Sequence, residues 1–202
     1  MEKLYLPKGY LSWSQMTIWK QNKKRYISEY FEKGKRLDTR ELRFGKFIAE
    51  MIESGEHKTL LPHLEVYELS ESEHRVVVNG VPTLSYLDSE RPSLNVFKEF
   101  KTGKNPWTQA KVEKHGQLVF YATVLAEVRG SIPEYCELDW IETEDIVGDD
   151  FWSQVDKKIQ VTGRIVSFRK YFTPEEIEEM RQDIRKTAEE ISEAYKLFIS
   201  EL

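Results

Sequence analysis

The N-terminal part of the chain contains two segments whose apolar residues recur at helical spacing. The first spans about 12–32, with Ser12 or Ser14 as the N-cap. The second spans about 39–54 and ends at Gly55, a residue type that commonly closes helices. Its predicted inner face includes Phe44, Phe47, Ile48, Met51 and Ile52. We therefore expect two helices before the first strand.

The hydrophobic period then shortens to that of strands. Aliphatic residues gather in short segments, and turn residues separate them, above all the pair Asn79-Gly80. One of these segments alternates Leu84, Tyr86 and Asp88 on successive even positions. We predict strands over 64–69, 75–79, 83–88 and 95–101, with turns at 79–80 and 89–93.

The second half returns to helical spacing and then to strands. A long helix is predicted over about 108–128 and a strand over 137–143. Residues 157–168 indicate a strand or a hairpin, with Gly163 at a bend or bulge. Thr173-Pro174-Glu175-Glu176 combines an N-cap, a proline in the first turn and a capping-box glutamate. A last helix therefore follows to the C-terminus.

The order of these elements predicts an α+β fold with a central mixed sheet flanked by helices, in the order αβββαβ. We expect this core over about 39–143, an added N-terminal helix over 11–33, and an added C-terminal hairpin plus helix over 157–202. No linker is long enough to divide the chain, so residues 1–202 are expected to form a single domain.

Composition narrows the class of protein. Hydrophobic residues make up 40% of the chain and aromatic residues 12%, which is enough for a packed core. No apolar run approaches the roughly 20 residues of a membrane helix, and no signal-peptide core is visible. Cys136 is the single cysteine, which excludes an iron–sulfur cluster within the chain and fits the reducing cytoplasm. The absence of a phosphate-binding GxxxxGK[ST] loop predicts no nucleotide cofactor.

Charge is distributed unevenly. The net charge of −5 argues at first against a nucleic-acid partner. Residues 20–46, however, contain ten basic and four acidic residues, a local charge of +6. Residues 174–202 contain nine acidic and four basic residues, a local charge of −5. Because a phosphate backbone responds to the local field, a basic N-terminal surface stays compatible with DNA.

One group of charged residues combines carboxylates with a lysine on predicted strands. Glu99 and Lys101 alternate with apolar neighbours, so both lie on one face of their strand. Asp88 ends the neighbouring strand and can reach the same face across an antiparallel pair. Two carboxylates and a backbone carbonyl suit Mg²⁺ or Mn²⁺, and the lysine can position an attacking water. The other interpretation, an exposed ion pair on a sheet edge, stays open here. The same acidic-x-Lys pattern also occurs at 56–58 and 156–158, without a strand-borne acid beside it.

Five motifs in order resemble the PD-(D/E)XK nuclease superfamily, in particular its RecB-like and phage-exonuclease branch. The resemblance covers about Leu11 to Ala122. Two positions depart from the family pattern. Ala49 stands where a histidine is frequent, and Asn22-Lys23 replaces a cysteine-proline pair. The motifs are Leu11-Ser12-Trp13-Ser14 with Arg25-Tyr26, Phe44–Glu53, Ser85-Tyr86-Leu87-Asp88, Glu99-Phe100-Lys101-Thr102-Gly103-Lys104 and His115–Ala122.

The resemblance implies roles for individual residues. Asp88, Glu99 and the backbone carbonyl of Phe100 would hold the metal, with Glu53 or Glu50 as a further acid. Lys101 would be the catalytic lysine, and Gln117 would be a further catalytic residue that borders the cleft near the DNA. The four histidines show no metal-ligand spacing, and we expect them to be solvent-facing or structural. The residues expected at the DNA are Tyr121, Ser14, Lys20, Lys24, Arg25, Arg43, Lys104 and Trp107, the last with core packing as its alternative.

Together these features predict a DNA nuclease that depends on Mg²⁺ or Mn²⁺, an exonuclease acting on the ends of linear DNA. The resemblance places it in recombination, repair or phage DNA metabolism, in the cytoplasm of a bacterial or phage-infected cell. Two alternatives stay open. One is a DNA-binding module without turnover. The other is a subunit whose acidic C-terminal helix docks a recombination or annealing protein through the apolar stripe from Ile177 to Phe198.

Overall fold

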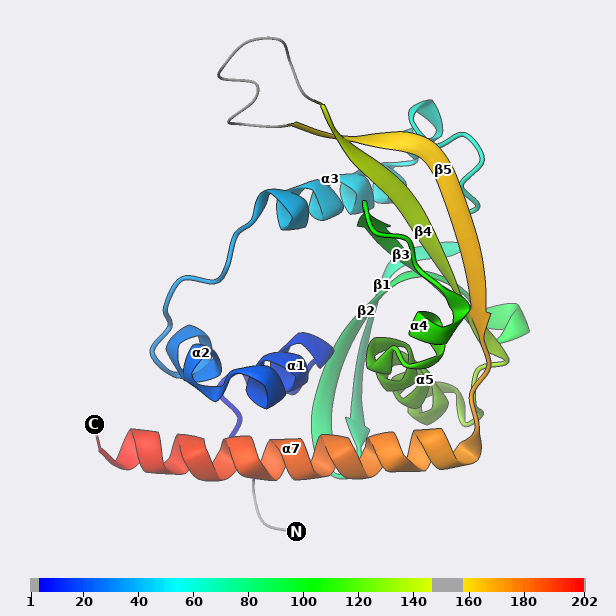
Figure 1. Ribbon diagram of the computed structural model, residues 1–202. Coiled ribbons are helices and arrows are strands. Elements are labelled where there is room, and N and C mark those ends of the chain that lie inside the picture. The colour runs from blue at the N-terminus through cyan, green and yellow to red at the C-terminus, as the bar shows by residue number, and fades with distance from the viewer. Residues whose placement is uncertain (1–3, 147–157, 202) are drawn as a thin grey trace, which may run out of the picture.

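A five-stranded sheet forms the centre of the protein in our computed structural model, which describes residues 4–146 and 158–201 (Figure 1). The strands lie side by side in chain order, and only β3 and β4 are parallel. The expected α+β fold with a mixed sheet is therefore confirmed. The strands are β1 (Leu69–Val78), β2 (Val81–Arg91), β3 (Val96–Gly103), β4 (Tyr135–Ile146) and β5 (Lys158–Lys170).

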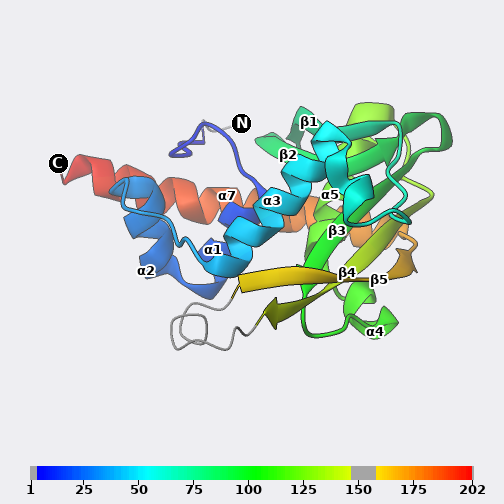
Figure 2. The ribbon, with the colours of Figure 1, turned by 90° about the horizontal axis from the view of Figure 1, so that it is seen from above.

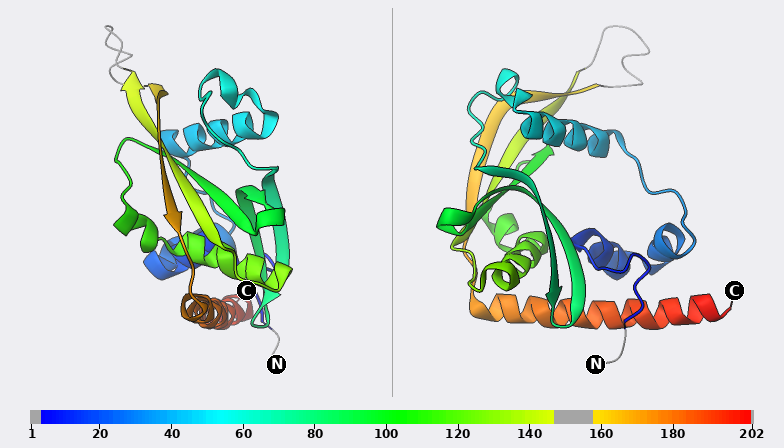
Figure 3. Two further views of the ribbon diagram at one scale, coloured as in Figure 1. Left: turned by 90° about the vertical axis from the view of Figure 1, so that its right-hand side faces the viewer. Right: turned by 180° about the vertical axis from the view of Figure 1, so that it is seen from behind.

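Helices pack against the sheet through two separate hydrophobic cores. Helix α3 (Arg40–Ser54) buries Ile48 and Ile52 in the smaller core, which also contains Ile141 of β4. The larger core contains residues of α1 (Trp13–Gln21), α5 (Gly116–Arg129) and α7 (Pro174–Ser200). Helices α3 and α7 lie at opposite ends of the molecule (Figures 1 and 3). Trp140 of β4 is buried in the larger core.

Two of the predicted helices are divided in the structure. The predicted helix over 12–32 divides into α1, α2 (Lys23–Tyr26) and the π-helix η1 (Ile27–Phe31). Asn22 is the break, because its side chain accepts a hydrogen bond from the Arg25 amide (2.9 Å) and caps α2. The predicted helix over 108–128 likewise divides into α4 (Gln109–Glu113) and α5. Short 3₁₀ segments, η2 (Glu56–Thr59) and η3 (Pro92–Leu94), follow α3 and β2.

One predicted strand and one predicted turn are wrong. Residues 64–68 form no strand. They connect η2 to β1, with Leu64 and Tyr67 buried. β2 continues to Arg91 through the predicted turn over 89–93, pairing with β3 as far as Val96. The turn at Asn79-Gly80 is confirmed, with φ values of 45° and 77° that suit a tight hairpin.

The C-terminal region also differs from the prediction. Residues 158–168 form part of one strand, β5, which pairs antiparallel with β4. Of the two alternatives for this segment, the single strand is confirmed and the hairpin is wrong. Asp156 and Lys157 lie outside the described residues. The bend is real, since Gly163 has a φ of 87°. Thr173 caps α7 with the predicted capping box.

Helix α7 runs beneath α1 and α5 (Figures 1 and 2) and uses its apolar stripe there. Ile177, Ile184 and Ile191 are buried, and Tyr195 and Phe198 pack against Phe31. The partner-docking alternative therefore loses the observation that motivated it. None of the described helices is long and apolar enough to cross a membrane.

Candidate active site

The pairing of β2 with β3 brings two predicted carboxylates together. Ser89 pairs with Lys98, so the register places Asp88 opposite Glu99 where the two strands begin to diverge. The Phe100 amide donates a hydrogen bond to Asp88 Oδ2 at 2.7 Å. Glu99 is only 2% exposed. This hydrogen bond from a backbone amide of β3 holds the Asp88 carboxylate beside Glu99.

Lys101 joins this pair to helix α5. Its ammonium donates to Glu99 Oε1 and, at 2.9 Å, to Gln117 Oε1. Gln117 in turn donates through Nε2 to the Tyr121 hydroxyl, also at 2.9 Å. The spacing of four residues puts Gln117 and Tyr121 on one face of α5. A continuous hydrogen-bonded chain therefore runs from the sheet to the helix, through four of the residues named from the sequence.

Electrostatics at this site are strongly coupled. Burial raises the pKa of Asp88 well above its ordinary value, and the charge of Glu99 raises it further. Burial lowers the pKa of Lys101, but the charge and hydrogen bond of Glu99 outweigh this, so the net pKa is raised and the ammonium is retained. Burial and the carboxylates of Glu53 and Glu99 raise the pKa of Glu71. Burial is thus the largest cause of the raised pKa values of Asp88 and Glu71, and the neighbouring carboxylates add to it.

The donor atoms fit a hard divalent cation in kind. Glu99 Oε2 is buried and has no hydrogen-bond partner among the described residues, so it is an acceptor available to a cation. Asp88, Glu99 and the Phe100 carbonyl offer oxygen only, the ligand type that Mg²⁺ and Mn²⁺ prefer. Within residues 4–146 and 158–201, no three His, Cys, Asp or Glu side chains converge as a metal site. Water would have to complete the coordination.

The two candidate acids of α3 differ in their surroundings. Glu53 is exposed, and its charge acts on Glu71. Glu50 is also exposed and forms an ion pair with Lys46, one turn away, at 3.5 Å. The structure therefore connects Glu53 electrostatically to the carboxylates and pairs Glu50 with a lysine of its own helix.

The residues predicted at the DNA differ in their surroundings. Ser14 is exposed and lines a cavity together with Gln117 and Tyr121. Trp107 is half-buried beside a second cavity, with its ring against His115 (centroids 4.9 Å apart). Lys24 is exposed. The other four cations are in ion pairs: Lys20 with Asp183, Arg25 with Glu29, Arg43 with Asp38, and Lys104 with Asp145.

Two residues near the site were missed. Glu71 lies opposite Asp88 in the β1–β2 register, and its φ of 50° marks a local irregularity. Extending the hairpin register from Asn79-Gly80 would have found it. His115 was expected to be solvent-facing or structural. Its Nε2 is buried and without a partner among the described residues, and burial together with Lys101 lowers its pKa to about 4.

Comparison with solved structures shows the fold. A proposed exonuclease from Eubacterium rectale superimposes with a TM-score of 0.56 at 12% identity, over 91% of this chain and 83% of that chain. A phage-related exonuclease from Haemophilus somnus 129PT gives a TM-score of 0.54 at 14% identity, over 87% and 79%. No family model and no curated protein sequence matches the chain. The expected PD-(D/E)XK nuclease-like fold is thus confirmed, as a fold.

Proposed function

We propose that the protein is a DNA nuclease that depends on Mg²⁺ or Mn²⁺, and that it acts as an exonuclease on the ends of linear DNA. The observation that carries the proposal is the convergence of Asp88, Glu99 and Lys101 at the fork between β2 and β3. The nuclease-like fold and the exonuclease names of the two similar structures support it. The setting we propose is DNA recombination, repair or phage DNA metabolism.

The residues divide the chemical work. Asp88, Glu99 and the Phe100 carbonyl would hold the divalent cation, which when bound polarises the phosphodiester and lowers the pKa of water. Lys101 orients the attacking water and offsets negative charge on the phosphate. Gln117 fixes the direction of the Lys101 ammonium through the 2.9 Å hydrogen bond. This arrangement supplies positioning and electrostatic stabilisation, the two effects on which phosphoryl chemistry depends.

The decisive experiment follows degradation of end-labelled linear DNA with Mg²⁺ or Mn²⁺. Lys101→Ala should abolish degradation. The matched control is Lys58→Ala, because Glu56-His57-Lys58 repeats the acidic-x-Lys pattern while Lys58 is exposed in η2. The control should keep full activity. Absence of metal-dependent degradation, or full activity in Lys101→Ala, would refute the proposal.

Closed circular DNA tests the exonuclease part separately. An enzyme that needs an end should leave the circle intact under conditions that degrade the linear form. Nicking or linearisation of the circle would instead assign an endonuclease, with the metal-dependent chemistry unchanged.

A DNA-binding module without turnover is the second candidate. It is favoured by the lack of three converging metal-ligating side chains within the described residues. It predicts DNA binding that weakens steeply with salt and no cleavage with any divalent metal. Cleavage that Asp88→Asn removes would exclude it.

A further inference from the structure

A cavity of about 260 Å³ opens beside the proposed catalytic residues and has no role in the proposed phosphodiester hydrolysis. The start of α1, the residues around η1, β2 and α5 enclose it. Leu11 forms backbone hydrogen bonds with Pro82 (2.8 Å) and Leu84 (3.0 Å), and these hold the start of α1 against β2. The cavity walls therefore come from segments that are far apart in sequence but tied together by backbone bonds.

The cavity is connected directly to the catalytic lysine. Gln117 and Tyr121 line it, and Gln117 accepts the hydrogen bond from Lys101. A group bound in the cavity would thus contact the outer end of the hydrogen-bonded chain that begins at Glu99. For a DNA strand whose phosphate lies at Lys101, the cavity is the place of an adjacent nucleotide.

The lining is aromatic more than cationic. Five of its twelve residues are tyrosine or tryptophan, none is acidic, and Arg36 is the one cation among them. Arg36 is exposed and stacks over Tyr30, with its guanidinium carbon 5.1 Å from the ring centroid. Flat apolar rings with a stacked guanidinium suit a planar heterocycle better than a phosphate, which needs several N–H donors.

One buried hydroxyl in the lining lacks a partner. Ser85 is 3% exposed, and its Oγ forms no hydrogen bond with any described residue. A buried polar atom without a partner destabilises a protein, so its presence calls for an explanation. A ligand with hydrogen-bonding groups at its edge provides one, and a nucleobase is both planar and polar at its edge.

We propose that this cavity binds the unpaired nucleobase adjacent to the phosphate addressed by Lys101. The inference rests on the proposed nuclease function and specifies its substrate, which becomes single-stranded or frayed DNA. Tyr86 at the exposed rim and Trp13 supply stacking surfaces, and Ser85 supplies a hydrogen bond to the base edge. Loss of one such stacking contact lowers affinity by about tenfold or more.

The test measures binding in EDTA, where no cleavage occurs. A labelled single-stranded 12-mer is titrated by fluorescence anisotropy, with 2-aminopurine or one abasic residue moved along the strand. One position should show quenched 2-aminopurine, and an abasic residue there should weaken binding by about tenfold. Equal affinity for all abasic positions would overturn the proposal. So would affinity that depends on a terminal phosphate and not on the base.

Two variants separate the cavity from folding effects. Tyr86→Ala should remove the quenching and the abasic effect, whereas Tyr86→Phe should retain both, although each loses the 2.6 Å hydrogen bond from the Tyr86 hydroxyl to Glu73. Ser85→Ala should weaken base binding while leaving the melting temperature unchanged or higher. A wild-type base preference in Tyr86→Ala would overturn the proposal. Metal-dependent cleavage is measured in parallel. If cleavage is present but the base effects are absent, the base-binding proposal fails and the proposed nuclease function stands.

Discussion

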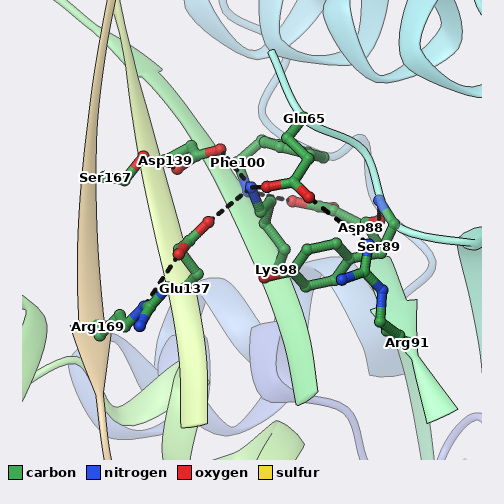
Figure 4. Close-up of polar contacts among 11 residues, drawn as sticks. Glu65, Asp88, Ser89, Arg91, Lys98, Phe100, Glu137, Asp139, Ser167 and Arg169 are labelled. Carbon is green, nitrogen blue, oxygen red and sulfur yellow. Dashed lines mark hydrogen bonds and ion pairs between the residues drawn. The ribbon is translucent and has the colours of Figure 1, made fainter. Parts of the chain in front are cut away.

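Replacement of Lys98 offers a direct test of how the catalytic strand is held. Lys98 lies one residue before Glu99, and its side chain is 1% exposed. Its ammonium forms ion pairs with Glu137 at 2.7 Å and Asp139 at 3.0 Å, both on β4 (Figure 4). Arg169 on β5 continues the network through Glu137. The cluster therefore ties β3 to β4 and β4 to β5.

The loss of folding stability expected in Lys98→Met follows from the burial of this ion pair. Lys98→Met keeps the apolar stem but leaves Asp139, 2% exposed, without its cation. Loss of one partner of a buried ion pair costs about 3–5 kcal/mol. At about 2–4 °C per kcal/mol for a chain of this size, the melting temperature should fall by roughly 6–20 °C. Burial lowers the pKa of Lys98, but Glu137 and Asp139 outweigh it and raise the pKa above its ordinary value, so the loss should be present throughout neutral pH.

Urea unfolding followed by tryptophan fluorescence measures the difference. Lys46→Met is the matched control, because Lys46 pairs with Glu50 while their side chains are 78% and 60% exposed. It should cost less than about 1 kcal/mol. Adding Asp139→Asn to Lys98→Met should restore part of the loss, since the unpaired charge disappears. A loss in Lys98→Met no larger than in Lys46→Met would refute the reasoning.

Three further outcomes are expected. Asp88→Asn should abolish cleavage yet raise the melting temperature of the metal-free protein at neutral pH, because a carboxyl group with a raised pKa destabilises the fold once it ionises. In thermal scans the difference in melting temperature should shrink toward about pH 4. A lower melting temperature of the variant at neutral pH would contradict this. Gln117→Ala should lower kcat about ten- to a hundredfold with little change in KM, and an unchanged kcat in steady-state kinetics would show that Lys101 needs no support. His115, with a pKa of about 4, should stay neutral above pH 5.5 in an NMR titration, and Lys101→Ala should raise that pKa; a fall would mean that Lys101 does not act on it.

Local signals in the sequence predicted the fold where one or a few neighbouring residues decide the outcome. Thr39 and Gly55 bound α3, and Thr173 with Glu176 caps α7, because caps depend on residues within one turn. The breaks at Asn22 and His115 were missed, since the apolar pattern continues across both. The prediction of a strand at Leu64 and Tyr67 was wrong for a related reason. Leu64 is buried with Ile48 and Ile52 of α3, and Tyr67 is buried beside Arg91 and Lys98, and such alternating burial resembles strand patterning.

The same distinction applies to the candidate site. Period-two alternation placed Glu99 and Lys101 together, and an antiparallel neighbour placed Asp88 beside them, so short-range geometry was sufficient. Glu71 was within reach of the same reasoning through the hairpin register. The ion pairs of Lys20 and Lys104 were not, because Asp183 and Asp145 are distant in sequence and only the tertiary fold brings them near.

These long-range pairs change what the charge distribution implies. The acidic helix α7 does more than lower the net charge of the chain. Its Asp183 and Glu190 form ion pairs with Lys20 and Lys23 of the basic N-terminal segment. At the proposed site, Glu53 and Glu99 act on Glu71, and Glu99 acts on Asp88, with Lys101 as the cation that moderates the Asp88 carboxyl. A divalent cation bound there would offset these carboxylates and strengthen the attraction of a DNA phosphate. On the proposed function, we therefore expect the metal to raise DNA affinity, and by linkage the factor by which the metal raises DNA affinity equals the factor by which DNA raises metal affinity.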